Sequence, residues 1–183
     1  MYNGRRDSQG LNQETIQKFM PVAKHFSQLR ARQEAQKGSR YAKIYVKNWD
    51  YLQDELKKIA GKEVTVPMIK VKTGDQFNKK VKVPKNIVCA GLAMYVQLLM
   101  YQQEKAPETS YHSCTECACF WSDKRIREVM GITNVNQFIK IMDSLIYVGA
   151  IVRKVGCYNG NFANYYFVNP MLTVKHNHIS EQF

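Results

Sequence analysis

The side chains best suited to chemistry are four cysteines and a histidine. Their spacing is His112-x-Cys114-x2-Cys117-x-Cys119, and Cys157 follows further along the chain. Thiolate and imidazole are the usual ligands of tetrahedral zinc. Cys117 and Cys119 lie two apart in a predicted strand, and Cys157 lies in a predicted hairpin that should pair with it. A zinc site normally has two ligand pairs, however, and small buried thiols beside a sheet are commoner. We therefore expect no metal or other cofactor. The alternative is a zinc site formed by these five residues.

Known catalytic motifs are absent from the sequence. It contains no Walker loop, no G-x-S-x-G elbow and no H-E-x-x-H pair. His176 and His178 have no acidic cluster nearby, and no paired histidines accompany a tyrosine as a DNA-nicking enzyme requires. We therefore predict that the protein is not an enzyme.

Positive charge is concentrated in the first half of the chain. The net charge of the 183 residues is +12. Residues 41–86 hold eleven Lys and Arg against five acids, whereas residues 87–183 hold eight against seven. A basic protein attracts polyanions such as DNA, RNA or an acidic membrane surface, although charge can also serve solubility alone.

The sequence favours a cytoplasmic protein. It has no apolar run of about 18 residues, which a membrane span needs. The segment MYNGRRDSQG is not followed by an apolar stretch, so it does not resemble a secretory signal. The five cysteines are odd in number and irregularly spaced, which is typical of a reduced compartment.

Hydrophobic periodicity predicts two small units before residue 84. Residues 1–40 form an arm and a helix over residues 12–37. Residues 41–83 form a basic subdomain in which a strand over 41–47 alternates apolar and polar side chains. Asn48 is the expected N-cap of the helix that follows and ends at Gly61. Strands over 64–72 and 77–83 then form a hairpin, with Pro67 on an edge.

Residues 84–170 show a longer pattern. An apolar helix over 87–103 is followed by a loop and a short strand over 117–121. Ser122 or Asp123 caps a helix that ends at Gly131, and a second helix runs from Asn134 to Val148. Strands over 150–156 and 164–169 follow, and residues 171–183 form a tail. This is the element order of a winged helix-turn-helix domain, so we expect an α+β fold.

A short turn between two helices makes the second helix protrude, and it then fits a major groove about 12 Å wide. Asn and Gln side chains pair with adenine, and Lys reaches guanine or phosphate. The start of the first helix and the strand hairpin would contact the DNA backbone. For each polar side chain, the alternative is an ordinary solvated surface residue. The candidate DNA contacts are Ser122, Lys124, Arg125, Asn134, Asn136, Gln137, Lys140, Arg153, Lys154, Tyr158, Asn159 and Asn161.

The basic subdomain could add sequence-independent phosphate contacts. Lys43 and Lys47 alternate with tyrosines on the predicted strand, and Lys79 and Lys80 lie in the predicted hairpin. Phosphate contacts of this kind steepen the salt dependence of binding. A solvated hairpin face is the alternative, and the tyrosines could also stack on single-stranded bases.

Three phrases resemble a known family. They are VPKNIV...AMYVQLLMY, FWSDKRIREVMGITNVNQFIKIMDSLIYVGAIVRK and YYFVNPML. They are similar to the winged-helix domain of replication initiators and replisome organisers of plasmids and phages in Gram-positive bacteria. The resemblance covers about half of the chain, and many transcription regulators share its middle phrase. This chain departs from a standard regulator in its arginine-poor second helix and its long basic segment upstream.

The sequence thus predicts a sequence-specific protein that binds double-stranded DNA in plasmid or phage replication initiation or its control. A homodimer or side-by-side assembly on repeated sites would compensate for the arginine-poor helix, and replication proteins are possible further partners. A transcriptional regulator is one alternative. The other is a protein-interaction module that does not bind DNA, because residues 87–183 carry almost no net charge.

Overall fold

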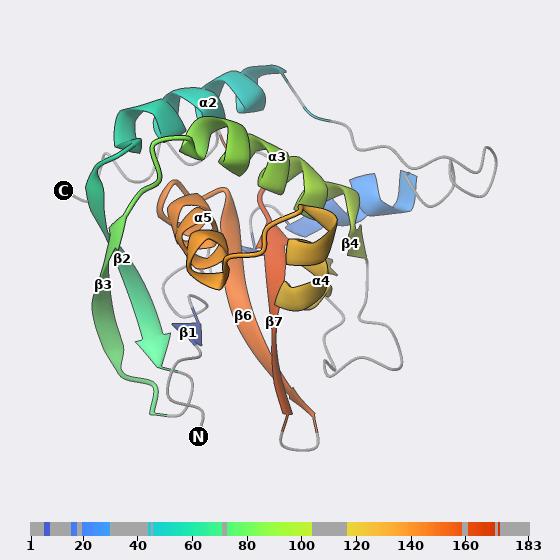
Figure 1. Ribbon diagram of the computed structural model, residues 1–183. Helices are drawn as coiled ribbons and strands as arrows, with labels where there is room; N and C mark the ends of the chain where they lie inside the picture. Colours follow the sequence, from blue (N-terminus) through green and yellow to red (C-terminus); the bar gives the residue numbers. More distant parts are fainter. Residues whose placement is uncertain are drawn as a thin grey trace.

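The fold is α+β, with helices packed beside two antiparallel sheets in a computed structural model (Figure 1). The structure describes residues 6–7, 16–17, 20–29, 44, 46–70, 73–103, 117–158, 161–170 and 172. Its elements are β1 (Arg6–Asp7), α2 (Val46–Ile59), β2 (Glu63–Lys70), β3 (Gln76–Lys82), α3 (Ile87–Met100), β4 (Gln102–Gln103), β5 (Ala118–Cys119), α4 (Asp123–Val129), α5 (Val135–Tyr147), β6 (Ile151–Tyr158) and β7 (Asn161–Val168).

Each sheet is built around one hairpin. The strand order is β1-β2-β3 in the first sheet and β4-β5-β7-β6 in the second. Helices α2 and α3 lie together at one end, and the β6–β7 ribbon extends away from them (Figure 1). Helix α5 contacts α3, both strands of the β2–β3 hairpin and β6. It is therefore the element on which the two sheets and the helical layer converge.

One hydrophobic core crosses the predicted boundary at Pro84. Leu52 and Leu56 of α2 and Val66 of β2 belong to the same buried cluster as Tyr95 of α3 and Leu145 of α5. A second, smaller cluster joins Ile16, Met20 and Ala23 to the other side of the second sheet. The segments predicted as separate units thus pack as one body within the described residues.

Helices α2 and α3 approach closely where α3 has a glycine. A Cβ atom on Gly91 would lie 2.8 Å from Leu56 Cδ1, which is closer than side chains normally pack. The apolar sequence of α3 reflects this position, because the helix has α2 on one side and α5 on another.

Most predicted elements after residue 48 are confirmed. The hairpin, the apolar helix, the short strand, the two later helices and the final strand pair all form, although the last two strands are longer than predicted. Ser122 is the N-cap of α4. Gly131 and Gly149 have φ of 65° and 72°, the left-handed values that end helices. The prediction that Pro67 places its strand on an edge is wrong for the strand as a whole, because β2 lies between β1 and β3. Pro67 itself pairs only with Asn78, because the β1 register covers just Ile69 and Lys70.

The predicted strand over 41–47 is wrong at its end, where α2 already begins at Val46. Asn48 is not an N-cap either. It is a buried residue of α2 whose amide donates a hydrogen bond to the Pro170 carbonyl. Pro170 is 122 residues from Asn48 in the sequence, so a tertiary contact favours the helical conformation at Asn48. The rest of the predicted strand, except Ile44, lies outside the described residues.

The N-terminal helix is confirmed in part. Residues 16–17 and 20–29 are helical, with Pro21 inside the second stretch, and the remainder of the predicted helix lies outside the described residues. No helix in the described ranges is both long and apolar enough to cross a membrane.

A buried carboxylate joins three elements. Asp143 of α5 is fully buried, and its side chain accepts from Lys79 of β3 and, at 3.3 Å, from Arg153 of β6. Arg153 also lies 3.2 Å from the Met68 sulfur of β2. A charge inside a protein is tolerated only when it is paired, so this cluster specifies how the hairpin packs on α5.

We expect Asp143→Ala to reduce the free energy of unfolding by about 3–5 kcal/mol, because Arg153 and Lys79 would then face each other without a counter-charge. Lys79→Ala should cost about 1–2 kcal/mol, since Asp143 keeps Arg153. Lys80→Ala, on the opposite face of β3, is the control and should stay within about 0.5 kcal/mol. Urea unfolding of the three variants gives the ranking, and equal midpoints for Asp143→Ala and Lys80→Ala would contradict it.

Candidate nucleic-acid interface

The N-terminal part of α5 is presented to solvent. Val135, Asn136, Gln137 and Lys140 are exposed, whereas all six residues over 141–146 are buried. Burial of six consecutive residues means that every face of the helix is covered there. One cover is the β2–β3 hairpin, held through Lys79 and Asp143. The polar side chains of α5 that are open to a ligand therefore lie in its first turns, and Tyr147 at its end is also exposed.

Asn134 has a structural task at the start of α5. It is the N-cap, and its side-chain oxygen accepts from the backbone N–H of Asn136 at 2.9 Å and of Gln137 at 3.1 Å. Such a cap satisfies donors that lack partners within the helix. Asn136 and Gln137, also predicted from the sequence, keep exposed side chains. The structure thus separates one capping residue from two amides that are available to a partner.

Helix α4 presents two exposed cations near its start. Lys124 is 79% exposed and lies 3.9 Å from Glu128, which is a weak surface pair. Arg125 is exposed, with its guanidinium carbon 4.5 Å from the centre of the Trp121 ring. Tyr101 lies on Trp121 in turn, with a centroid separation of 3.7 Å. Ser122 accepts from the Arg125 N–H, so its hydroxyl serves the helix end.

Two predicted contacts on the β6–β7 hairpin are wrong. Arg153 is only 7% exposed and pairs with Asp143, and Lys154 is only 5% exposed, with its ammonium 4.9 Å from the centre of the Phe167 ring. The physical reason is that β6 is covered on both faces. Ile151 faces the main core while Val152 faces the smaller cluster, so their successors alternate in the same way. Neither cation is presented to DNA.

The side chains predicted at the tip of that hairpin lie outside the described part of the chain. This applies to Tyr158, Asn159 and Asn161, although β6 and β7 pair as far as the register Tyr158–Asn161.

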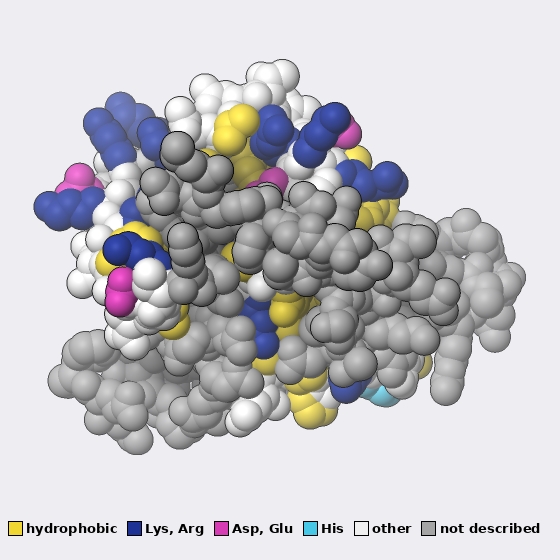
Figure 2. All heavy atoms as spheres, turned by 90° about the horizontal axis from the view of Figure 1, so that it is seen from below, with side chains coloured by type: hydrophobic (Ala, Val, Ile, Leu, Met, Phe, Trp, Pro, Cys, Tyr) yellow, Lys and Arg dark blue, Asp and Glu magenta, His cyan; other side chains and the backbone are white. Residues whose placement is uncertain are grey.

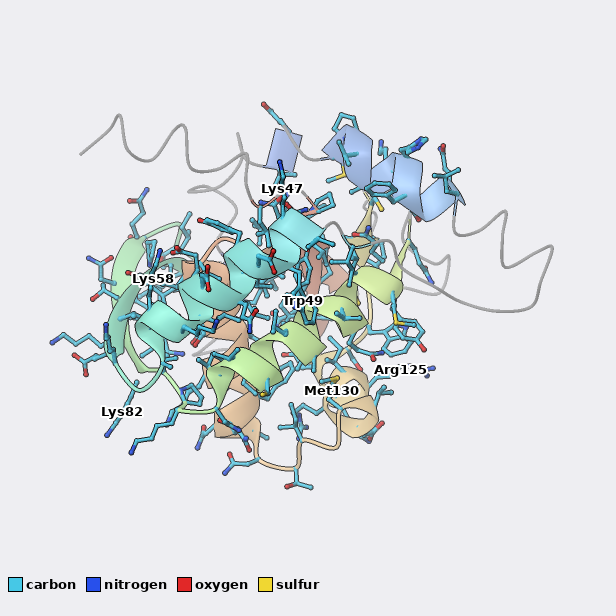
Figure 3. The ribbon with its side chains drawn as sticks, turned by 90° about the horizontal axis from the view of Figure 1, so that it is seen from above. Lys47, Trp49, Lys58, Lys82, Arg125 and Met130 are labelled. Atoms are coloured by element: carbon cyan, nitrogen blue, oxygen red, sulfur yellow. The ribbon has the colours of Figure 1, made fainter. Side chains whose placement is uncertain are left out.

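The predicted basic contacts of residues 41–83 separate in space. Lys79 faces inward to Asp143, and Lys80 is 77% exposed and 3.4 Å from Glu63. Figure 3 shows Lys82 towards the same edge as Met130, the C-cap of α4, and Lys47 towards the opposite edge. Lys47 and Lys82 therefore lie towards different sides of the molecule (Figure 3). Lys43 lies outside the described residues.

The described positive side chains do not form one continuous face in the view from below (Figure 2). Described Lys and Arg side chains lie there in separate groups around the surface (Figure 2). Several exposed lysines are also near acids, such as Lys57 with Asp54 and Lys58 with Glu55. Charge alone therefore does not define the interface, and the polar end of α5 is the more specific feature.

The described cysteines do not form a zinc site. Cys117 packs in the smaller cluster and Cys119 in the main core, so the two cysteines do not lie on one face of a strand, as their spacing had predicted. No group of three metal-ligating side chains occurs among the residues that the structure describes. His112, Cys114 and the side chain of Cys157 lie outside them.

Asp123, the first residue of α4, is fixed by the second sheet. Its carboxylate accepts from Tyr166 and Asn164, both at 2.7 Å. Burial raises the pKa of the Tyr166 hydroxyl well above its ordinary value, and the charge of Asp123 raises it further. The hydroxyl therefore stays protonated at neutral pH and anchors the start of α4 to β7.

Sequence reasoning missed two residues that matter here. Val135 is 50% exposed at the first position of α5. It lies directly after Asn134, where the sequence predicted the helix to start, and an apolar residue in a first turn of exposed polar residues was a usable signal. Asp143 was also missed. It interrupts an apolar helix, but its partners lie 10 and 64 residues away, so local sequence could not identify them.

Comparison with family models, curated proteins and solved structures gives no significant match.

The role of Asn134 can be separated from that of its neighbours by stability. We expect Asn134→Ala to lower the free energy of unfolding by about 1 kcal/mol, and Asn134→Asp to retain most of it, because aspartate is an equally good cap. Asn136→Ala should remain within about 0.5 kcal/mol. Thermal or urea unfolding measures all three, and a larger loss for Asn136→Ala than for Asn134→Ala would reverse the assignment.

Proposed function

We propose that residues 84–170 form a winged helix-turn-helix domain that binds double-stranded DNA through α5. Three features of the fold support it. The order α3, β5, α4, α5, β6, β7 matches helix, strand, helix, turn, helix and wing. The strand order β5-β7-β6 is also the one expected when a final hairpin pairs with the short earlier strand. The α4–α5 connection is short and contains Gly131 with positive φ.

The exposed first turns of α5 carry the proposal. Asn136 and Gln137 offer amides with both donor and acceptor groups, and Lys140 follows one turn later. Recognition helices contact base edges with their N-terminal residues. Lys124, Arg125 and Lys82 supply cations for the phosphate backbone on either side, which fixes orientation without reading sequence.

The biological role that we propose is initiation or control of plasmid or phage replication. It rests on the resemblance of the three sequence phrases to replication initiators. The small free surface of α5 adds a physical reason for repeated sites, because one copy can contact only a few base pairs. We therefore propose that several copies bind side by side or as a dimer.

The test is binding of the full chain to DNA that flanks its own gene. We expect a footprint on that DNA and a preference of at least about a thousandfold over random duplex, as specific binders show. The combined change of Asn136, Gln137 and Lys140 to Ala should remove the preference and leave weaker, salt-sensitive binding, because the backbone contacts remain.

Asn78→Ala is the matched control, since this exposed asparagine lies on β3 away from α5; it should keep the preference. Survival of the preference in the triple variant would show that α5 does not read the bases. Absence of any duplex binding at low salt would reject DNA binding and favour a protein-interaction module.

A further inference from the structure

We infer that α5 reads a short half-site of consecutive A·T pairs, with Val135 contacting a thymine methyl group. The inference rests on the proposed DNA-binding function and names the bases that the same surface would select. It follows from the side chains of α5 that are exposed and have no role in capping the helix or packing the core.

The length of the half-site follows from burial. The exposed polar side chains of α5 lie within residues 135–140, where Phe138 is buried, and residues 141–146 are covered on all faces. Six residues span about 9 Å at about 1.5 Å per residue. Base pairs are about 3.4 Å apart, so this part of the helix can face about three of them. The pair of Lys79 with Asp143 holds the β2–β3 hairpin against the buried part of α5.

The chemistry of the open residues favours adenine and thymine. The two exposed amides match the N6 donor and N7 acceptor of adenine, and an apolar side chain suits the thymine methyl group. Val135 is 50% exposed directly beside Asn136. A half-exposed valine on a protein surface has little intramolecular value, whereas beside an A·T pair it would bury apolar area.

The usual guanine reader is missing from this surface. Helix α5 contains no arginine, and Lys140 is its one cation. Of the arginines of α4, Arg125 lies over Trp121 near the start of that helix, where we assign it to the phosphate backbone, and Arg127 donates to the Thr133 carbonyl at 3.3 Å. Bidentate recognition of guanine is therefore not available from the described arginines near the α4–α5 turn. Lys140 is one turn past Asn136, where a phosphate contact suits a point charge.

The experiment is selection of bound duplexes from a random library by the full chain, followed by single-atom changes in the selected site. We expect about three consecutive A·T pairs, with each G·C replacement weakening binding roughly tenfold. Replacing one thymine by uracil should weaken binding about three- to fivefold, the value of one buried methyl group. Replacing an adenine by 7-deazaadenine should cost roughly tenfold, since N7 is lost.

Variants assign these effects to side chains. Val135→Ala should remove the sensitivity to uracil. The control is Val46→Ala, which makes the same change at a valine on α2 that is 74% exposed, and it should preserve the sensitivity. Lys140→Ala should weaken binding to all sequences and leave the A·T preference unchanged.

The outcomes separate the two levels of the proposal. A selected site dominated by G·C pairs, with the preference lost in Lys140→Ala, would overturn the A·T assignment while DNA binding stands. Insensitivity to uracil at every thymine would overturn the role of Val135. Failure to enrich any duplex would overturn the proposed function itself.

Discussion

The buried carboxylate of Asp143 is the interaction on which the arrangement of this protein depends. It lies within a helix that otherwise faces the main core, and it is held by a lysine from the first sheet and an arginine from the second. An unpaired charge at that depth would cost several kcal/mol, so the two sheets must be correctly placed around α5 for the fold to be stable. The cluster also makes the basic hairpin an integral part of the body, although its surface is polar.

This packing divides α5 into two parts. Residues 141–146 are buried, and α5 contacts α3, the β2–β3 hairpin and β6, so this part of the helix serves stability. Its N-terminal half carries a cap, two free amides, a valine and a lysine, and it is the part that we propose for recognition. A short recognition surface limits what one copy can read. The proposed binding to repeated sites and the proposed A·T half-site both follow from this limit.

Sequence periodicity predicted the elements whose pattern is local. The amphipathic α5, the apolar α3 and the β2–β3 hairpin were predicted correctly, because the spacing of apolar residues along each element follows which of its residues are buried. The start of α2 was not, since Ile44 and Val46 alternate like a strand while Asn48 is held by a contact with Pro170. Arg153 and Lys154 were predicted on the surface because charged side chains usually are. Coverage of β6 on both faces is a tertiary property, and it overrides that preference. The amides of α5 were predicted correctly as exposed, whereas the capping role of Asn134 required its geometry.

The central claim is that the first turns of α5 and the neighbouring edge of the hairpin form the DNA surface. Amide hydrogen exchange of the full chain, compared with and without a bound duplex, tests it most directly. The account predicts slower exchange over residues 133–140 and near Lys82, with no change at the start of α2 around Lys47. Slower exchange confined to α2, with residues 133–140 unaffected, would contradict it.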